Sequence, residues 1–216
     1  MIIDNILILA FIAALCSLDI TAFGQFMISR PIFCAPLFGW LMGDITSGLW
    51  VGMVVEMVWI NAIPMGAAVP IDIASIAILA TYWTAKFFPG MQSAAVWGIV
   101  LAVPLAYFFK EIDVIGRNFN IKIMKWVERG VAAGKESRID AGIFMGLALF
   151  FLRFMAFYLF AMFVGGLIYQ DIFLQLSASI LIGLKKAWYI LPVFGFGAMI
   201  YNFRHVGLAF FKGKNG

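Results

Sequence analysis

From residue 141 to residue 168 the chain is apolar and aromatic, and Arg153 is its one charged residue. A run of this length exceeds the roughly 20 residues that a helix needs to cross the hydrocarbon core of a bilayer. The whole 216-residue chain is also poor in charge, since 64% of it is hydrophobic and 12% is charged. A soluble domain has about a quarter of its residues charged. The sequence therefore predicts an all-α polytopic membrane protein, with residues 1–216 forming a single membrane domain.

The N-terminal part, residues 1–109, is divided into short apolar pieces. Glycines, prolines and the turn-like sequence "GDITSG" separate them. Such short pieces favour discontinuous helices and re-entrant hairpins, because irregular backbone at membrane depth needs burial in protein or a cavity beside it. The pieces are residues 5–17, 32–43, 47–63, 73–88 and 92–109.

A charged stretch, residues 110–140, follows these pieces. It combines seven lysines and arginines with a loose apolar stripe at helical spacing. We interpret it as an amphipathic linker that lies on the cytoplasmic membrane surface, and the basic tail of the C-terminal part, 141–216, as cytoplasmic too. In that last part we expect a helix break at Lys185-Lys186. Membrane topology accounts for the basic residues, so we expect no nucleic-acid partner.

Polar residues inside the membrane segments are the candidates for function. An ionisable side chain in the bilayer costs about 2.5–3.5 kcal/mol and is therefore turned to the protein interior or to water. Uncharged polar groups there also need partners. The candidates are Asp19, Gln25, Arg30, Asp44, Glu56, Asn61, Asp72 and Arg153.

The stretch "VEMVWINAIPMGAAVPID", residues 55–72, concentrates these groups. On an unbroken helix Glu56 and Asn61 would lie about 140° apart, so they share a cavity only if the helix ends between them. Carboxylates and amides offer the several hydrogen-bonding positions that suit sugar hydroxyls. The substrate-binding candidates are Gln25, Glu56, Asn61, Gly66, Ala67 and Asp72.

An alternative interpretation assigns the same groups to holding a broken helix together. For Glu56 and Asp72 both interpretations stay open. We favour a structural role for Arg30 and Asp44 as turn caps, and for Arg153 as a counter-ion in helix packing. Asp19 joins them as a structural or gating candidate.

Several chemistries have no motif in this sequence. It contains neither a P-loop nor GxGxxG nor a metal-ligand cluster. Cys16 and Cys34 lie in apolar surroundings and are expected to be packed thiols. The single histidine, His205, is in the basic tail without supporting groups. We therefore expect no catalytic residue, no metal and no cofactor, and the interpretation as an intramembrane enzyme lacks a nucleophile.

The run from residue 29 to residue 81 resembles the signature region of the IIC permease subunit of mannose/fructose/sorbose-type sugar phosphotransferase systems. A weaker similarity is "ILPVFGFGAMI", residues 190–200, to the family's Gly-rich last span. The landmarks of the signature are Arg30-Pro31, Gly43-Asp44, Gly48, Gly52, Glu56-Met57, Gly66-Ala67-Ala68 and Asp72.

The resemblance implies broken helices and re-entrant hairpins around a substrate site near the membrane midplane. It implies a multi-pass protein of the bacterial inner membrane that moves a hexose or amino sugar together with a IID subunit. The cytoplasmic IIA and IIB proteins would supply the phosphate, and IIC–IID pairs would assemble into an oligomer. The alternative is a IIC-like scaffold or sensor that no longer transports sugar.

Overall fold

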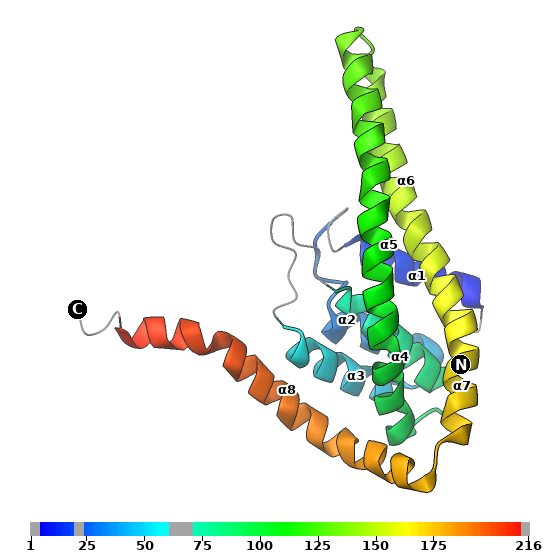
Figure 1. The fold of residues 1–216 in the computed structure, drawn as a ribbon, viewed down its shortest axis with the longest axis vertical. Coiled ribbons are helices and arrows are strands. Elements are labelled where there is room, and N and C mark those ends of the chain that lie inside the picture. Colours follow the sequence, from blue (N-terminus) through cyan, green and yellow to red (C-terminus); the bar gives the residue numbers. More distant parts are fainter. Residues whose placement is uncertain (1–4, 20–23, 61–70, 213–216) are drawn as a thin grey trace.

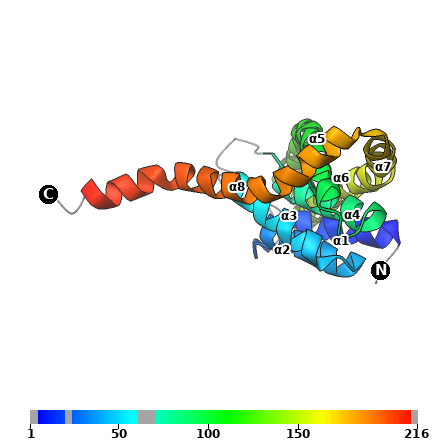
Figure 2. The ribbon, with the colours of Figure 1, turned by 90° about the horizontal axis from the view of Figure 1, so that it is seen from below.

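The computed structural model describes residues 5–19, 24–60 and 71–212, and side chains as far as Phe203. A body made of short helices carries a long helical hairpin that extends away from it, and a final helix leaves the body in another direction (Figures 1 and 2). The described elements are α1 (Ile6–Leu18), α2 (Pro31–Met42), α3 (Ile45–Val58), α4 (Ile73–Phe87), α5 (Gln92–Ala132), α6 (Ser137–Phe160), the π-helical turn η1 (Ala161–Gly165), α7 (Gly166–Gln175) and α8 (Ala178–Lys212).

Helix lengths confirm an α-helical membrane protein with short N-terminal pieces. Within the described residues, three stretches are long and apolar enough to cross a membrane: Gln92–Ala132, Ser137–Gln175 and Ala178–Phe203. The helices α1 to α4 have only 12 to 15 residues each. At 1.5 Å per residue they are about 18–22 Å long, less than the roughly 30 Å of a hydrocarbon core.

The helices α2 and α3 form a tight hairpin, as the sequence predicted. Pro31 stands at the start of α2, where its missing N–H costs nothing. Gly43 ends α2 with a φ of 84°, a left-handed conformation that glycine adopts without strain. A Cβ on Gly48 would lie 2.5 Å from the Ala35 carbonyl oxygen, and one on Gly52 would lie 2.5 Å from the Pro31 carbonyl oxygen. Glycines thus let the two backbones touch, as in other membrane helix pairs.

The helix α4 is the centre of the body. Every residue from Ile73 to Ala85 is buried, so no side of this helix faces the surroundings. Its indole Trp83 packs against Gly165 of η1, where a Cβ would lie 2.8 Å from the ring, and stacks on Tyr169 at 5.6 Å between ring centroids. This burial places the N-terminus of α4, with Asp72, inside the protein.

The first helix is attached to the body through α6. The hydroxyl groups of Ser17 and Tyr158 share a buried hydrogen bond of 2.8 Å. The ring of Phe11 meets that of Phe151 edge to face, with centroids 5.3 Å apart. These contacts join residues more than half the chain apart.

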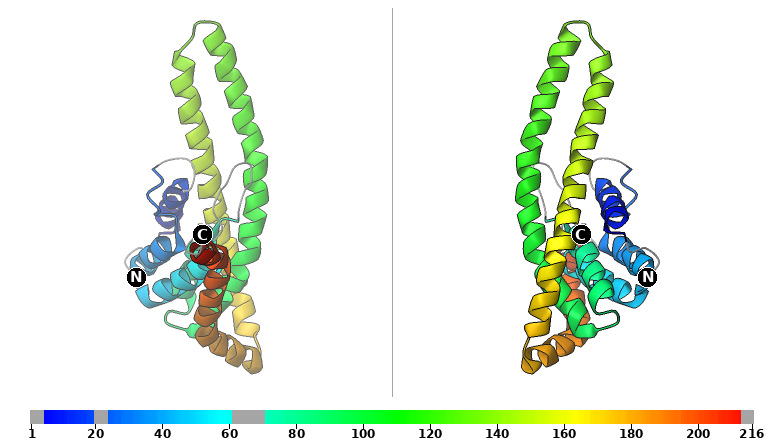
Figure 3. Two further views of the ribbon diagram at one scale, coloured as in Figure 1. Left: turned by 90° about the vertical axis from the view of Figure 1, so that its left-hand side faces the viewer. Right: turned by 90° about the vertical axis from the view of Figure 1, so that its right-hand side faces the viewer.

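The prediction of a separate amphipathic helix over residues 110–140 is wrong. The helix α5 continues from Gln92 to Ala132 and pairs with α6 as an antiparallel hairpin (Figure 3). Of the predicted apolar stripe, Val127 lies against Gly142 of α6, next to Ile123. The other members of the stripe are exposed: Ile121, Met124, Trp126 and Val131. Both proposed divisions, after residues 109 and 140, fall inside helices.

The predicted break at Lys185-Lys186 is also absent. The helix α8 continues through both lysines and through Pro192. The chain turns earlier, at Leu176, whose backbone is extended. Both lysine side chains are exposed, so they require no turn. Stacked indoles of Trp50 and Trp188, with centroids 3.8 Å apart, attach the first turns of α8 to α3.

Candidate functional site

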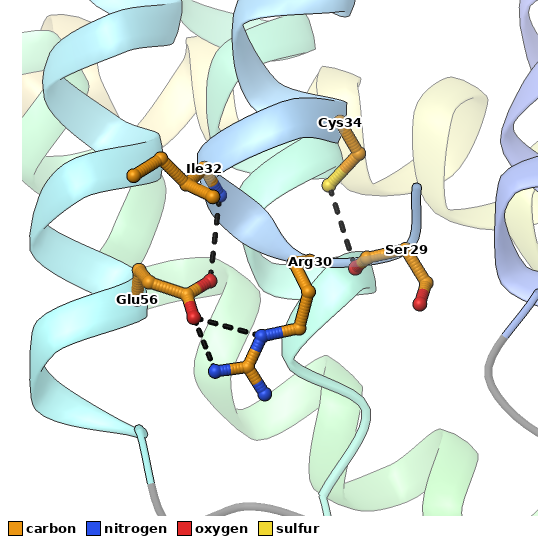
Figure 4. A network of polar contacts seen from close by, with 5 residues as sticks. All are labelled: Ser29, Arg30, Ile32, Cys34 and Glu56. Carbon is orange, nitrogen blue, oxygen red and sulfur yellow. Dashed lines mark hydrogen bonds and ion pairs between the residues drawn. The ribbon is translucent and has the colours of Figure 1, made fainter. Parts of the chain in front are cut away.

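An ion pair between Glu56 and Arg30 joins the end of α3 to the start of α2 (Figure 4). The Nε of Arg30 donates to Oε1 of Glu56 at 2.8 Å, and the Nη2 of Arg30 contacts the same oxygen. The other oxygen, Oε2, accepts from the backbone N–H of Ile32 at 3.4 Å. This N–H lies in the first turn of α2 and has no partner within its own helix. Arg30, predicted to cap a turn, therefore reaches across the hairpin to a carboxylate.

Asp72 caps the central helix with one of its two carboxylate oxygens. Its Oδ1 accepts from the backbone N–H groups of Ala74, at 3.1 Å, and Ser75, at 3.4 Å. Its Oδ2 is buried and has no hydrogen-bond partner among the described residues. Burying a carboxylate oxygen without a hydrogen-bond donor costs free energy. A ligand that donates a hydrogen bond to this oxygen would remove that cost.

Asp19 organises the connection between α1 and α2. Its Oδ1 accepts from the backbone N–H of Phe26 at 2.5 Å, and its Oδ2 accepts from the N–H and the hydroxyl of Ser29 at 3.2 and 3.3 Å. The carbonyl of Ser29 in turn accepts from the thiol of Cys34 at 3.8 Å (Figure 4). These bonds hold the backbone immediately before Arg30. Gln25 lies in the same connection with an exposed side chain and a φ of 54°.

Asp44 connects the hairpin to the loop between α4 and α5. Its Oδ1 caps α3 by accepting from the N–H of Ser47 at 3.2 Å, as its predicted structural role requires. Its Oδ2 accepts from the N–H of Gly90 at 2.8 Å.

Replacement of Asp44 by alanine should therefore destabilise the fold. Both acceptors are lost, and the N–H groups of Ser47 and Gly90 keep no partner. We expect the free energy of unfolding to fall by about 2 kcal/mol, the sum of a helix cap and one further hydrogen bond. Unfolding of the purified protein in detergent measures this loss. Asp171→Ala, at an exposed position of α7, is the control, and an equal loss in both variants would contradict the assignment.

Arg153 forms an ion pair with Asp113, a residue that the sequence analysis did not select. The Nη1 of Arg153 lies 3.4 Å from Oδ1 of Asp113 and donates to its backbone carbonyl at 3.2 Å. Arg117 donates to the other carboxylate oxygen at 3.1 Å. Gly116 makes room for the Arg153 side chain, since a Cβ there would overlap the guanidinium. The sequence shows that Asp113 and Arg117 are one helical turn apart. It does not show that Arg153 of α6 pairs with Asp113.

The candidate carboxylates Glu56 and Asp72 lie at two helix ends, Glu56 near the end of α3 and Asp72 at the N-cap of α4. Glu56 and Asp72 both interact electrostatically with the buried Cys34, and Asp113 interacts with Asp72. Among the candidates, Glu56 is engaged by Arg30, while Asp72 keeps one carboxylate oxygen without a partner among the described residues. The other candidates Asn61, Gly66 and Ala67 lie outside the described residues, in the segment that leads to Asp72.

The arrangement is typical of a membrane protein that handles a polar solute. Charged groups within the apolar body pair with each other, and one carboxylate oxygen stays open at a helix end. Two solved structures share this fold. One is described as a membrane protein, with a TM-score of 0.73 and 22% identity, over 99% of this chain and 88% of that chain. The other is the mannose transporter ManYZ in complex with microcin E492, with a TM-score of 0.66 and 24% identity, at the same coverage.

The fold and its partly buried ion pairs define an α-helical integral membrane protein. The model of the PTS system sorbose-specific IIC component family matches residues 3–208, and the chain belongs to this family. This confirms the resemblance read from residues 29–81.

Curated relatives agree with this assignment. The chain is 28% identical over 134 residues to the mannose-specific EIIC component of Escherichia coli K12, a match that covers 62% of this chain and 49% of that protein. It is 24% identical over 116 residues to the sorbose-specific EIIC component of Klebsiella pneumoniae, covering 54% and 42%. The chain spans about half the length of the curated relatives it matches.

Proposed function

We propose that this chain binds a hexose or amino sugar and carries it across the bacterial plasma membrane as the IIC subunit of a mannose-type phosphotransferase system. A IID subunit completes the path, and a IIB protein, charged by IIA, phosphorylates the sugar. The phosphoryl chemistry belongs to those partners, and the role of this chain is to bind and move its substrate.

The observation that carries the proposal is the unpartnered Oδ2 of Asp72. It is a buried acceptor at the N-terminus of the central helix, and in the sequence it follows the segment that contains Asn61 and Gly66. A sugar hydroxyl supplies the hydrogen bond that this oxygen lacks, and a bond to a charged acceptor contributes about 1.5–3 kcal/mol. The pair Glu56–Arg30 stabilises the neighbouring hairpin, and Glu56 remains a candidate for a second contact.

The change Asp72→Asn tests this role without removing the helix cap. An asparagine oxygen still accepts from Ala74 and Ser75, while its NH₂ replaces the open oxygen. We expect the KM for sugar uptake to rise about tenfold to a hundredfold, which corresponds to the loss of one such hydrogen bond. The apparent melting temperature should stay within a few degrees of the wild type.

The measurement is uptake and phosphorylation of a panel of hexoses and amino sugars by membranes that contain this chain with its IID, IIA and IIB partners. Asp171→Asn is the matched control. Unchanged uptake by Asp72→Asn would remove Asp72 from the site. Absence of uptake for every sugar with the wild-type chain would contradict the transport function itself and favour the scaffold alternative.

A further inference from the structure

The segment before α2, residues 24–29, which we call the connection, has a strained backbone. Gln25 and Met27 have φ angles of 54° and 66°, and Gly24 has one of 92°. Among the residues that the structure describes, no other residue except glycine has a positive φ. A side chain in this left-handed region clashes with the backbone, so each such residue costs free energy and persists only where surrounding contacts hold it.

Packing of the connection does not explain this conformation. The side chains of Phe26, Met27 and Ile28 are 73%, 66% and 44% exposed, so the connection contributes little to the core. A simple turn would have glycine or asparagine at its left-handed positions, because these residues adopt that conformation at low cost. The glutamine at position 25, whose side chain is also exposed, therefore indicates a use for this side chain other than packing.

The buried carboxylate of Asp19, at the end of α1, holds the connection in this shape. One oxygen accepts from the backbone N–H of Phe26 at 2.5 Å, and the other accepts from the N–H and the hydroxyl of Ser29 at 3.2 and 3.3 Å. All three donors belong to the connection. Hydrogen bonds to an ionised acceptor are stronger than those between neutral groups, so together they can hold a strained backbone.

The connection leads directly to the ion pair of the candidate site. The carbonyl of Met27 accepts from the N–H of Arg30 at 3.0 Å, and the guanidinium of Arg30 pairs with Glu56 (Figure 4). We propose that Asp19 is a positioning residue for sugar binding, which acts through the connection without touching the sugar. It keeps the strained backbone in the conformation that places Gln25 at the sugar and Arg30 beside Glu56. This role rests on the proposed function.

The variant Asp19→Ala separates positioning from stability. Without its three hydrogen bonds the connection leaves the strained conformation, so the KM for uptake of the preferred sugar of the panel should rise about tenfold or more. The maximum rate per folded protein should stay within about threefold of the wild type. A merely structural role would lower the melting temperature and leave the KM of the remaining folded protein unchanged, and that result would overturn the proposal. Asp19→Asn keeps one acceptor oxygen, should raise the KM less, and serves if the alanine variant does not fold.

A glycine at a strained position should rescue sugar binding. Glycine adopts a φ near that of Met27 without strain, so Met27→Gly added to Asp19→Ala should lower the KM again by about threefold or more. Ile28→Gly is the matched control, since Ile28 is the exposed neighbour of Met27 and its φ is not positive. This control should leave the KM at the value of Asp19→Ala. Equal recovery with both glycines, or recovery with neither, would overturn the proposal.

A second measurement examines the connection without transport. A spin label attached to Phe26→Cys reports the local mobility of the backbone, and the wild type is the blank because Cys16 and Cys34 are buried. We expect a more mobile label when Asp19 is replaced by alanine. Equal mobility with and without the carboxylate would overturn the proposal, whether or not sugar is taken up. Conversely, absent uptake by the wild-type chain would contradict the proposed function, while a label that Asp19 immobilises would still show that this residue holds the connection.

Discussion

The variant Gly48→Leu should fail to accumulate as folded protein in the membrane. The α carbon of Gly48 faces the α2 backbone so closely that even a single Cβ would lie 2.5 Å from the Ala35 carbonyl oxygen. A leucine side chain has no space there, and α2 and α3 would have to separate. Because Arg30 directly precedes α2 and Glu56 lies near the end of α3, their separation would also break the ion pair of the candidate site.

The smaller change Gly48→Ala gives a measurable version of the same effect. Overpacking of this kind costs about 1–3 kcal/mol, and here it outweighs the roughly 1 kcal/mol that alanine gains over glycine in a helix. We expect a lower apparent melting temperature in detergent. Gly183→Ala is the matched control, because nothing lies within 4 Å of a Cβ at that helical position, and it should leave stability unchanged or raise it. A stable Gly48→Ala protein would contradict the close packing of the hairpin.

The second large effect is expected from reversing the charge of Glu56. In Glu56→Arg two guanidinium groups face each other in a partly buried position, where the side chains of Arg30 and Glu56 are only 25% and 14% exposed. Loss of the pair alone should cost about 2 kcal/mol, between the values for exposed and buried ion pairs, and the repulsion adds to this. We expect a strong loss of both folded protein and sugar uptake.

The double exchange Arg30→Glu, Glu56→Arg then separates the two roles that the sequence left open for Glu56. Restored attraction should recover much of the melting temperature. If Glu56 contacts sugar, uptake should stay at least tenfold below the wild type despite the recovered fold, because the carboxylate has moved to α2. Full recovery of uptake would assign Glu56 to scaffolding alone. Glu136→Gln, in the exposed turn before α6, controls for loss of an acidic residue.

Local signals in the sequence were enough to predict the hairpin of α2 and α3. Pro31, Gly43 and Asp44 determine where each helix begins or ends through their own backbone or side chain, so their effect does not depend on distant residues. Asp72 caps α4 through an equally local contact, but the sequence analysis did not assign it this role or show that only one of its oxygens is used.

The long hairpin could not be predicted in the same way. An apolar residue such as Val127 looks identical in the sequence whether it faces lipid or another helix, and only its contact with Gly142 of α6 decides between them. The pairs Arg30–Glu56 and Asp113–Arg153 join residues 26 and 40 positions apart. A charge pattern along one helix cannot reveal a partner on another, which is why Asp113 was missed.

The bond between Ser17 and Tyr158 has a consequence for how the protein is made. The first helix emerges from the ribosome long before its partner on α6, since 141 residues separate the two hydroxyl groups. Until α6 has been synthesised and inserted, the polar hydroxyl of Ser17 lacks its native partner. Docking of the N-terminal helix is therefore a late, post-insertion step of biogenesis, so a nascent chain truncated before Tyr158 should leave α1 accessible to protease.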